Sequence, residues 1–163
     1  MPIPSIAARR LPRVAPIAFA AFAPRLGKEA PDGRIVVAGL GPAGLFAAYA
    51  LASFGYRPLA LERGKPVLAR TRDVRAFWEG GPLDPESNAM FGEGGAGAFS
   101  DGKLTTRIKD PLANDILETL VRFGAPEETA YQAKPHIGTD RLCGVISAIR
   151  EEIVRLGGEV RFE

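Results

Sequence analysis

The sequence is poor in the residues that most often carry metal and redox chemistry. It has one cysteine, Cys143, and one histidine, His136, in 163 residues. A single cysteine excludes an internal disulfide, and no cysteine or histidine spacing typical of a zinc site is present. A disulfide reductase, which needs a pair of redox-active cysteines, is excluded for the same reason. We therefore expect no metal site and a cytoplasmic, reducing environment.

The sequence also lacks long apolar runs, and residues 34–163 lack a large net charge. No apolar run approaches 18 residues, so no membrane segment is expected. Residues 34–163 carry 16 basic and 17 acidic side chains, which gives no electrostatic reason to expect nucleic-acid binding. Residues 1–28 hold five basic side chains and no acid, with the short apolar stretch IAFAAFA. This pattern weakly imitates a secretory signal, but its prolines favour a disordered leader over residues 1–33.

Residues 34–62 predict a βαβ unit. RIVVAG is typical of a buried strand over about 34–38, and LGPAG turns the chain into a helix, LFAAYALASFG, that ends at Gly55. YRPLALE then forms a second strand that ends at Glu62. This order predicts an α/β protein with a Rossmann-like FAD/NAD(P)-binding fold and a parallel sheet.

The turn in this unit matches the dinucleotide-binding pattern GxGxxG. Gly39 permits a tight turn, Gly41 lets the backbone approach a pyrophosphate, and Gly44 lets the helix pack against the strand. The helix N-terminus offers free N–H groups to the phosphates. Glu62 stands 23 residues after Gly39, where its carboxylate can accept hydrogen bonds from ribose hydroxyls. The sequence therefore predicts dinucleotide binding.

Residues 63–138 are expected to be an insertion, followed by a helix and a strand over 139–163. Weak periodicity predicts a helix over 66–79, and seven glycines make residues 80–103 turn-rich. A helix follows Pro111 and ends at Gly124. Another begins near Thr139, a suitable N-cap, and its apolar stripe comprises Leu142, Val145, Ile146, Ile149, Ile153 and Leu156. EVRFE then alternates as a strand.

For several side chains outside the glycine clusters, the sequence favours a structural role. Phe77 and Trp78 are expected in the core, and Cys143 is expected as a packed thiol. The preferred interpretation of Arg70, Arg72 and Arg75 is a solvated helix face, with one of them reaching a phosphate as the alternative. His136 is expected to be structural or at the surface rather than catalytic.

A second glycine cluster, GEGGAGAFSDGKL, begins at Gly92. Its GAFSDGKL portion fails as a triphosphate-binding loop, because Leu104 replaces the required Ser or Thr and no strand precedes it. The alternative is a backbone-rich loop in which Gly92, Gly94, Gly95 and Gly97 approach a flat ligand. Lys103 would place positive charge near a reduced flavin. A tight structural loop with a surface lysine remains the other interpretation.

The distance to the next strand favours FAD over NAD as the ligand. A nicotinamide-binding unit normally reaches its third strand after one further helix. Here the next convincing strand begins about a hundred residues after Glu62. The insertion between them contains the second glycine cluster, which would supply the second wall that a flavin ring requires.

Three stretches together resemble a known group of flavoproteins. They are VAGLGPAGLFAAYALASFGYRPLALERG, FWEGGPLDPESNAMFGEGGAGAFSDGKLTTRIKD and KPHIGTDRL. Over residues 34–163 the chain resembles the uncharacterised FAD-dependent dehydrogenases related to glutathione-reductase-like flavoproteins. The resemblance implies the following contacts: Gly39, Gly41, Pro42, Ala43 and Gly44 with the FAD pyrophosphate, Glu62 and Arg63 with the adenosine ribose, and Gly94, Gly95 and Gly97 with the flavin.

Proteins of that group are typically several hundred residues long. The resemblance therefore implies an N-terminal fragment whose sheet is incomplete at the C-terminus. The expected function is an FAD-dependent oxidoreductase with an unassigned substrate, electron acceptor and catalytic residues. A truncated, non-catalytic nucleotide-binding fragment and an NAD(P)-binding Rossmann domain are the alternatives.

Overall fold

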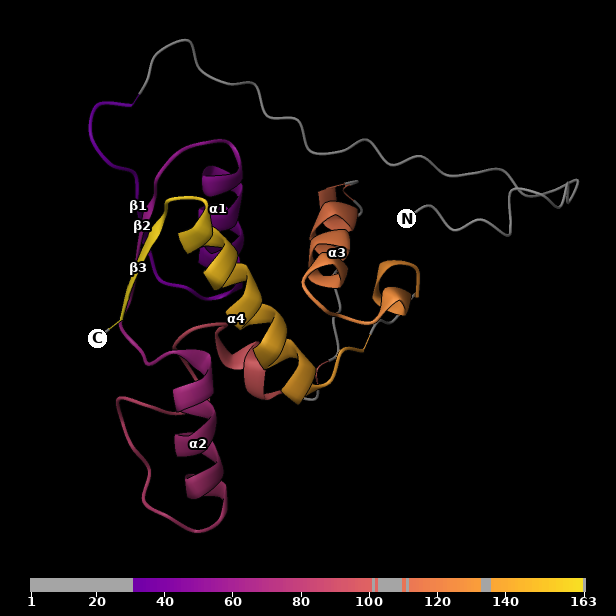
Figure 1. Cartoon of the computed structure of the whole chain (residues 1–163). Helices are drawn as coiled ribbons and strands as arrows, with labels where there is room; N and C mark the ends of the chain where they lie inside the picture. The colour runs from indigo at the N-terminus through magenta and orange to yellow at the C-terminus, as the bar shows by residue number, and fades with distance from the viewer. Residues whose placement is uncertain (1–30, 101, 103–109, 111, 133–135, 163) are drawn as a thin grey trace, which may run out of the picture.

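The computed structural model describes residues 31–100, 102, 110, 112–132 and 136–162. Most of the expected leader, residues 1–30, lies outside the described residues, as does Lys103. The described chain forms a mixed α/β structure with one parallel sheet and helices packed against it (Figure 1). The expected α/β class with a parallel sheet is thereby confirmed.

The sheet has three short strands, β1 (Val36–Ala38), β2 (Leu59–Glu62) and β3 (Glu159–Phe162). They lie in the order β1-β2-β3, and both neighbouring pairs are parallel. The register aligns Val37 with Ala60 and Ala60 with Val160, so these three side chains share one face. Ala60 is fully buried and the other two pack against the core, so this is the face that the helices cover.

The first helix, α1 (Pro42–Ser53), connects β1 to β2 and begins directly after the glycine turn. Its sequence is rich in alanine and leucine, and Pro42 occupies the first turn, where a missing N–H costs nothing. Leu45, Ala48 and Ala52 form its buried face at a spacing of three or four residues. Small alanines on this face let α1 approach the next helix that covers the sheet.

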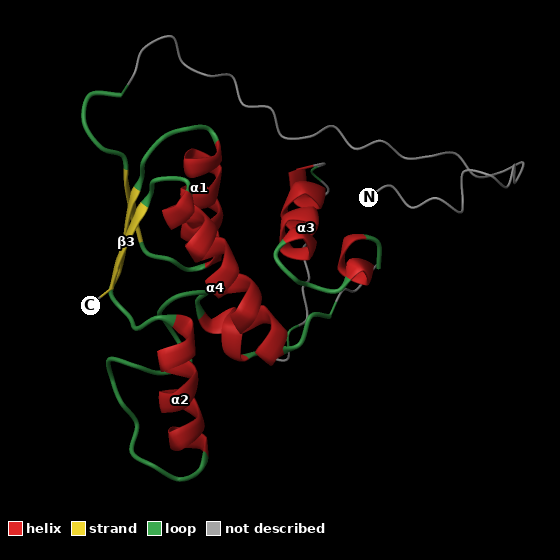
Figure 2. Cartoon of the chain, viewed as in Figure 1, coloured by secondary structure: helices red, strands yellow, loops and turns green. Residues whose placement is uncertain are grey.

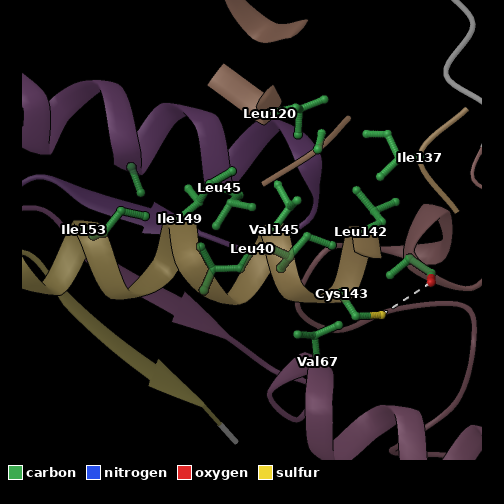
Figure 3. Packing of buried hydrophobic residues seen from close by; sticks show 14 of the residues in the cluster. Leu40, Leu45, Val67, Leu120, Ile137, Leu142, Cys143, Val145, Ile149 and Ile153 are labelled. Carbon is green, nitrogen blue, oxygen red and sulfur yellow. Dashed lines mark hydrogen bonds between the residues drawn. The ribbon is translucent and has the colours of Figure 1, made fainter. Parts of the chain in front are cut away.

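That neighbour is α4 (Thr139–Arg155), which supplies more buried hydrophobic side chains than any other described element. Val145 is 2% exposed, and Ile149 and Ile153 are fully buried. They belong to one apolar cluster with Leu40 of the glycine turn and Leu45 of α1 (Figure 3). The stripe expected for this helix is confirmed, although Gly138 rather than Thr139 occupies the N-cap position. The Thr139 hydroxyl instead donates a hydrogen bond to the Ser100 carbonyl, 2.6 Å away.

The region between β2 and α4 contains α2 (Val67–Trp78), α3 (Leu112–Arg122) and two short 3₁₀ helices. These 3₁₀ helices are η1 (Ala96–Phe99) and η2 (Glu127–Ala130). A long loop runs back from the end of α2 to η1 (Figure 2). Part of this loop packs along α2 and brings Gly94 and Gly95 to the glycine turn that follows β1.

Two expectations for α2 are wrong. Phe77 and Trp78 were expected in the core but are 43% and 59% exposed. Arg70 was expected on a solvated face but is fully buried. The buried face of α2 is instead Val67, Arg70 and Val74, whose spacing of three and four residues places them on one side of the helix.

None of the helices in the described part of the chain has the length and apolar character needed to cross a bilayer.

We expect Ile149→Ala to lower the free energy of unfolding by about 2–5 kcal/mol, because a fully buried side chain would leave a cavity between α4 and α1. Val154→Ala, on the exposed side of the same helix at 52% exposure, should change it by less than about 1 kcal/mol. Urea unfolding followed by circular dichroism measures both. Equal losses in the two variants would contradict the assigned core.

Candidate functional site

The glycine turn lies where β1 ends and α1 begins. The Gly39 N–H donates to the Leu61 carbonyl at 2.7 Å, which ties the turn to the end of β2. A Cβ on Gly44 would lie 1.9 Å from the Gly39 carbonyl oxygen, so only glycine fits there. A Cβ on Gly41, by contrast, would meet no atom within 4 Å. Gly44 therefore closes the turn, whereas Gly41 borders open space.

The N-terminus of α1 carries unsatisfied donors at this turn. Gly41 is the N-cap and makes no side-chain capping hydrogen bond, and no acidic residue lies in the first turn. Pro42 has no N–H, so Ala43 and Gly44 hold the first free backbone donors of a 12-residue helix. Both the donors and the helix dipole favour an anionic group at this position.

The second glycine segment, residues 92–97, packs directly against this turn. The Gly94 N–H donates to the Leu40 carbonyl at 2.8 Å. A Cβ on Gly95 would lie 3.0 Å from Pro42 Cδ, and one on Gly94 would lie 2.4 Å from Ile146 Cδ1. Two glycine clusters about fifty residues apart are therefore in backbone contact. Gly97 is exposed, and a Cβ there would meet no atom within 4 Å.

Glu62 lies beneath the turn and is 8% exposed. Its Oε2 accepts a hydrogen bond from the Leu40 N–H at 2.6 Å, and its Oε1 accepts one from the Gly64 N–H at 2.8 Å. The carboxylate thus clamps the turn to the end of β2, while the ribose contact expected of it stays a prediction. Arg63 points outward, where it pairs with Glu86 at 2.9 Å and lies over the Phe91 ring.

A buried carboxylate, Glu93, lies inside the second glycine segment. It is fully buried, and its Oε2 accepts hydrogen bonds from the Val67 N–H at 2.7 Å and from Arg150 at 3.3 Å. Its Oε1 has no hydrogen-bond partner among the described residues. Burial raises the pKa of Glu93, although the Val67 N–H and the Arg150 charge act in the opposite direction.

Sequence reasoning missed Glu93, Arg70 and Arg150 as members of this region. A signal for Arg70 was present, because it shares helical spacing with Val67 and Val74. Glu93 is the only ionisable residue in the glycine-rich segment 92–97. An isolated acid in such a segment could have indicated a side chain that is hydrogen-bonded within the fold. Arg150 gave no signal, because it lies on α4 far along the chain.

Cys143 and His136, two further residues considered from the sequence, are not part of the glycine turn. Cys143 is buried, and its thiol donates to the Ala98 carbonyl at 3.7 Å (Figure 3), while burial raises its pKa. His136 is exposed. Within the described segments, no three His, Cys, Asp or Glu side chains are grouped closely enough to hold a metal ion.

Two surface hollows lie elsewhere on the molecule. One, of about 430 Å³, lies near the amino ends of β1 and β3 and includes Arg34 and Gly157 in its lining. The other, of about 370 Å³, is formed by α2 and the loop that follows it, with Trp78 and Met90 in its wall. Neither of these two hollows includes the glycine turn in its lining.

No protein-family model matches the chain. A relative from Clostridium beijerinckii (strain ATCC 51743 / NCIMB 8052), named "Uncharacterized protein", is 58% identical over 136 residues. The match covers 83% of this chain and 26% of the relative, so the chain spans about a quarter of that protein's length.

These comparisons correct the family assignment. The resemblance to FAD-dependent dehydrogenases related to glutathione-reductase-like flavoproteins is wrong as an identification, because no such family model matches and the relative's name gives no activity. A 163-residue chain with a three-stranded sheet is also not evidently an N-terminal fragment of such a flavoprotein.

The geometry of the turn separates two glycines that the motif treats alike. We expect Gly44→Ala to destabilise the fold by at least about 1–3 kcal/mol, because its Cβ would overlap the Gly39 carbonyl. Gly41→Ala should stay within about 1 kcal/mol of the parent, because its φ of −62° suits alanine and the space is open. Thermal and urea unfolding compare them. A destabilised Gly41→Ala beside an unaffected Gly44→Ala would refute this assignment of roles.

The raised pKa of Glu93 predicts a pH dependence of stability. The folded chain binds this proton more tightly than the unfolded chain, whose Glu pKa is about 4.3, so the free energy of unfolding falls as pH rises through the raised folded pKa. Glu93→Gln cannot ionise. Its stability relative to the parent should therefore increase as the pH rises above the unfolded Glu pKa and through the raised folded pKa. Urea unfolding at several pH values measures this, and a difference that is constant with pH would contradict it.

Proposed function

We propose that the chain binds FAD in a Rossmann-like arrangement and functions in FAD-dependent oxidation or reduction of an unassigned substrate. The observation that carries the proposal is the packing of the second glycine segment, residues 92–97, against the glycine turn. It supports a site made by two backbone surfaces at the carboxyl ends of parallel strands, which is where open α/β sheets bind their ligands.

The glycine turn fits the pyrophosphate part of a dinucleotide. Gly41 leaves space that a Cβ would otherwise occupy, and the N–H groups of Ala43 and Gly44 are the free donors of α1. Backbone donors at a helix N-terminus stabilise phosphate oxygens without a dedicated basic side chain. Glu62, at the end of β2, is close enough to hold the turn while its remaining lone pairs accept from ribose hydroxyls.

The second segment favours FAD over a nicotinamide dinucleotide. It places Gly95 against Pro42 and leaves Gly97 exposed and open, so a flat ring can approach the backbone. Flavin, when bound, supplies the hydride and electron chemistry, and the protein supplies the orientation. The only ionisable side chain of residues 39–44 and 92–97 is the buried Glu93, which suits this division of roles.

The same observation supports a second candidate, dinucleotide binding without turnover. The described glycine segments present backbone and small side chains, but no exposed acid, base or nucleophile. Reduction of bound flavin separates the two candidates. Bleaching of the visible flavin absorption by NADH or NADPH under anaerobic conditions supports the oxidoreductase over binding alone.

We expect the purified chain to bind FAD with near-equimolar stoichiometry, measured by quenching of flavin fluorescence, and to bind NAD more weakly. Gly41→Ala should raise the Kd for FAD at least about tenfold, equivalent to ~1.4 kcal/mol, because its Cβ would enter the space for the pyrophosphate.

The matched control is Gly144→Ala, at an exposed position of α4 where a Cβ meets no atom within 4 Å. This control should leave the Kd for FAD unchanged. A chain that is folded by circular dichroism yet shows no saturable FAD binding would refute the proposal.

A further inference from the structure

Arg70 is the largest of the fully buried side chains in the described part of the chain. A buried guanidinium is costly unless its donors are satisfied, and burial does lower its pKa from the ordinary value. Its position on the inner face of α2, between Val67 and Val74, would ordinarily suit an aliphatic residue. The chain therefore retains a charge where packing alone does not require one.

The donors of Arg70 are satisfied by the loop that carries the second glycine segment. Its Nε donates to the Asn88 carbonyl at 2.8 Å and its Nη2 donates to the Ala89 carbonyl at 3.3 Å. The carbonyls of Glu93 and Gly95 accept from Nη1 and Nη2 at 2.8 and 2.7 Å. All four acceptors are backbone oxygens of residues 88–95.

The loop is also fitted closely around this side chain. A Cβ on Gly92, whose φ is 111°, would lie 2.7 Å from Arg70 Cδ. The guanidinium carbon lies 4.5 Å from the centroid of the Phe99 ring in η1. Arg70 is therefore enclosed on one side by the glycine backbone and on another by an aromatic ring.

These contacts fix the direction of the peptide groups. In a planar trans peptide the C=O of one residue and the N–H of the next point in opposite directions. With the Glu93 carbonyl turned to Arg70, the Gly94 N–H points away from it and reaches the Leu40 carbonyl of the glycine turn. With the Gly95 carbonyl turned to Arg70, the N–H of the exposed Ala96 also points away.

We propose that Arg70 is a positioning residue of the cofactor site, an inference that rests on the proposed FAD-binding function. Its guanidinium holds four carbonyl oxygens inward, away from an anionic ligand: those of Asn88, Ala89, Glu93 and Gly95. The Gly94 N–H then docks the segment on the glycine turn, and the Ala96 N–H is presented as a donor to an oxygen of the bound dinucleotide. Arg70 acts through the backbone and does not itself touch the ligand.

The test compares Arg70→Lys with Arg72→Lys, an exposed arginine on the same helix. Lysine keeps the charge at position 70 but cannot supply the planar fork that four carbonyls occupy. We expect amide hydrogen exchange at Gly94 and the neighbouring loop to accelerate at least about tenfold, with exchange in α1 and α4 unchanged. The Kd for FAD should rise at least about tenfold, and the visible spectrum of bound flavin should shift. Arg72→Lys should match the parent in all three.

Gly92→Ala is the second variant. The Cβ of the introduced alanine would overlap the Arg70 side chain from the loop, while the arginine and its charge stay in place. This second variant is decisive if Arg70→Lys does not fold. A folded variant that keeps the exchange rate at Gly94 and the Kd for FAD overturns the role of Arg70 while the proposed function stands. A parent chain that does not bind FAD refutes the proposed function and, with it, the role of Arg70 in a cofactor site. The amide hydrogen exchange data then test only whether Arg70 orients the loop.

Discussion

The hydrogen bond from the Gly94 N–H to the Leu40 carbonyl joins the two glycine-rich segments, and the candidate site depends on it. The surroundings of both residues restrict substitution. Gly94 has a φ of 79°, and a Cβ there would overlap Ile146 of α4, while Leu40 is a fully buried residue of the turn. The contact therefore links the sheet, the glycine turn and α4 in one place. Any side chain at Gly94 would separate the surfaces on which ligand binding is proposed.

Two buried carboxylates stabilise this junction from below. Glu62 accepts backbone N–H groups from Leu40 and Gly64, and Glu93 accepts the N–H at the start of α2 together with Arg150. Hydrogen bonds to a charged acceptor are worth about 1.5–3 kcal/mol each, enough to offset part of the desolvation of a buried carboxylate. The two acids thus bind backbone N–H groups that no strand or helix hydrogen bond satisfies.

Local sequence signals accounted for the part of the fold that depends on neighbours in the chain. The strand, turn, helix and strand of residues 34–62 follow from β-branched residues, closely spaced glycines and an alanine-rich stretch, each read over a few positions. The buried face of α4 follows from the spacing of Val145, Ile149 and Ile153. These features require no knowledge of what lies opposite.

The same signals failed where a distant segment decides the environment. On α2, hydrophobicity places Trp78 inside and Arg70 outside, but the loop over residues 88–95 returns along the helix and offers carbonyls to the arginine. The docking of Gly94 on Leu40 depends on the same return and is equally invisible in a local window. The glycine pattern indicated a backbone surface, yet only the tertiary structure identifies what that surface contacts.

A site built from backbone behaves differently from one built from side chains. Only a substitution to proline deletes one of its N–H donors, so its chemistry is otherwise altered through the groups that set peptide orientation and close approach. In the proposed site, Gly41 leaves room for the ligand, Gly44 closes the turn, and Arg70 is proposed to set which way the second segment presents its N–H groups. Residues 39–44 and 92–97 contain no exposed ionisable group, so any selectivity for a substrate must come from side chains outside them.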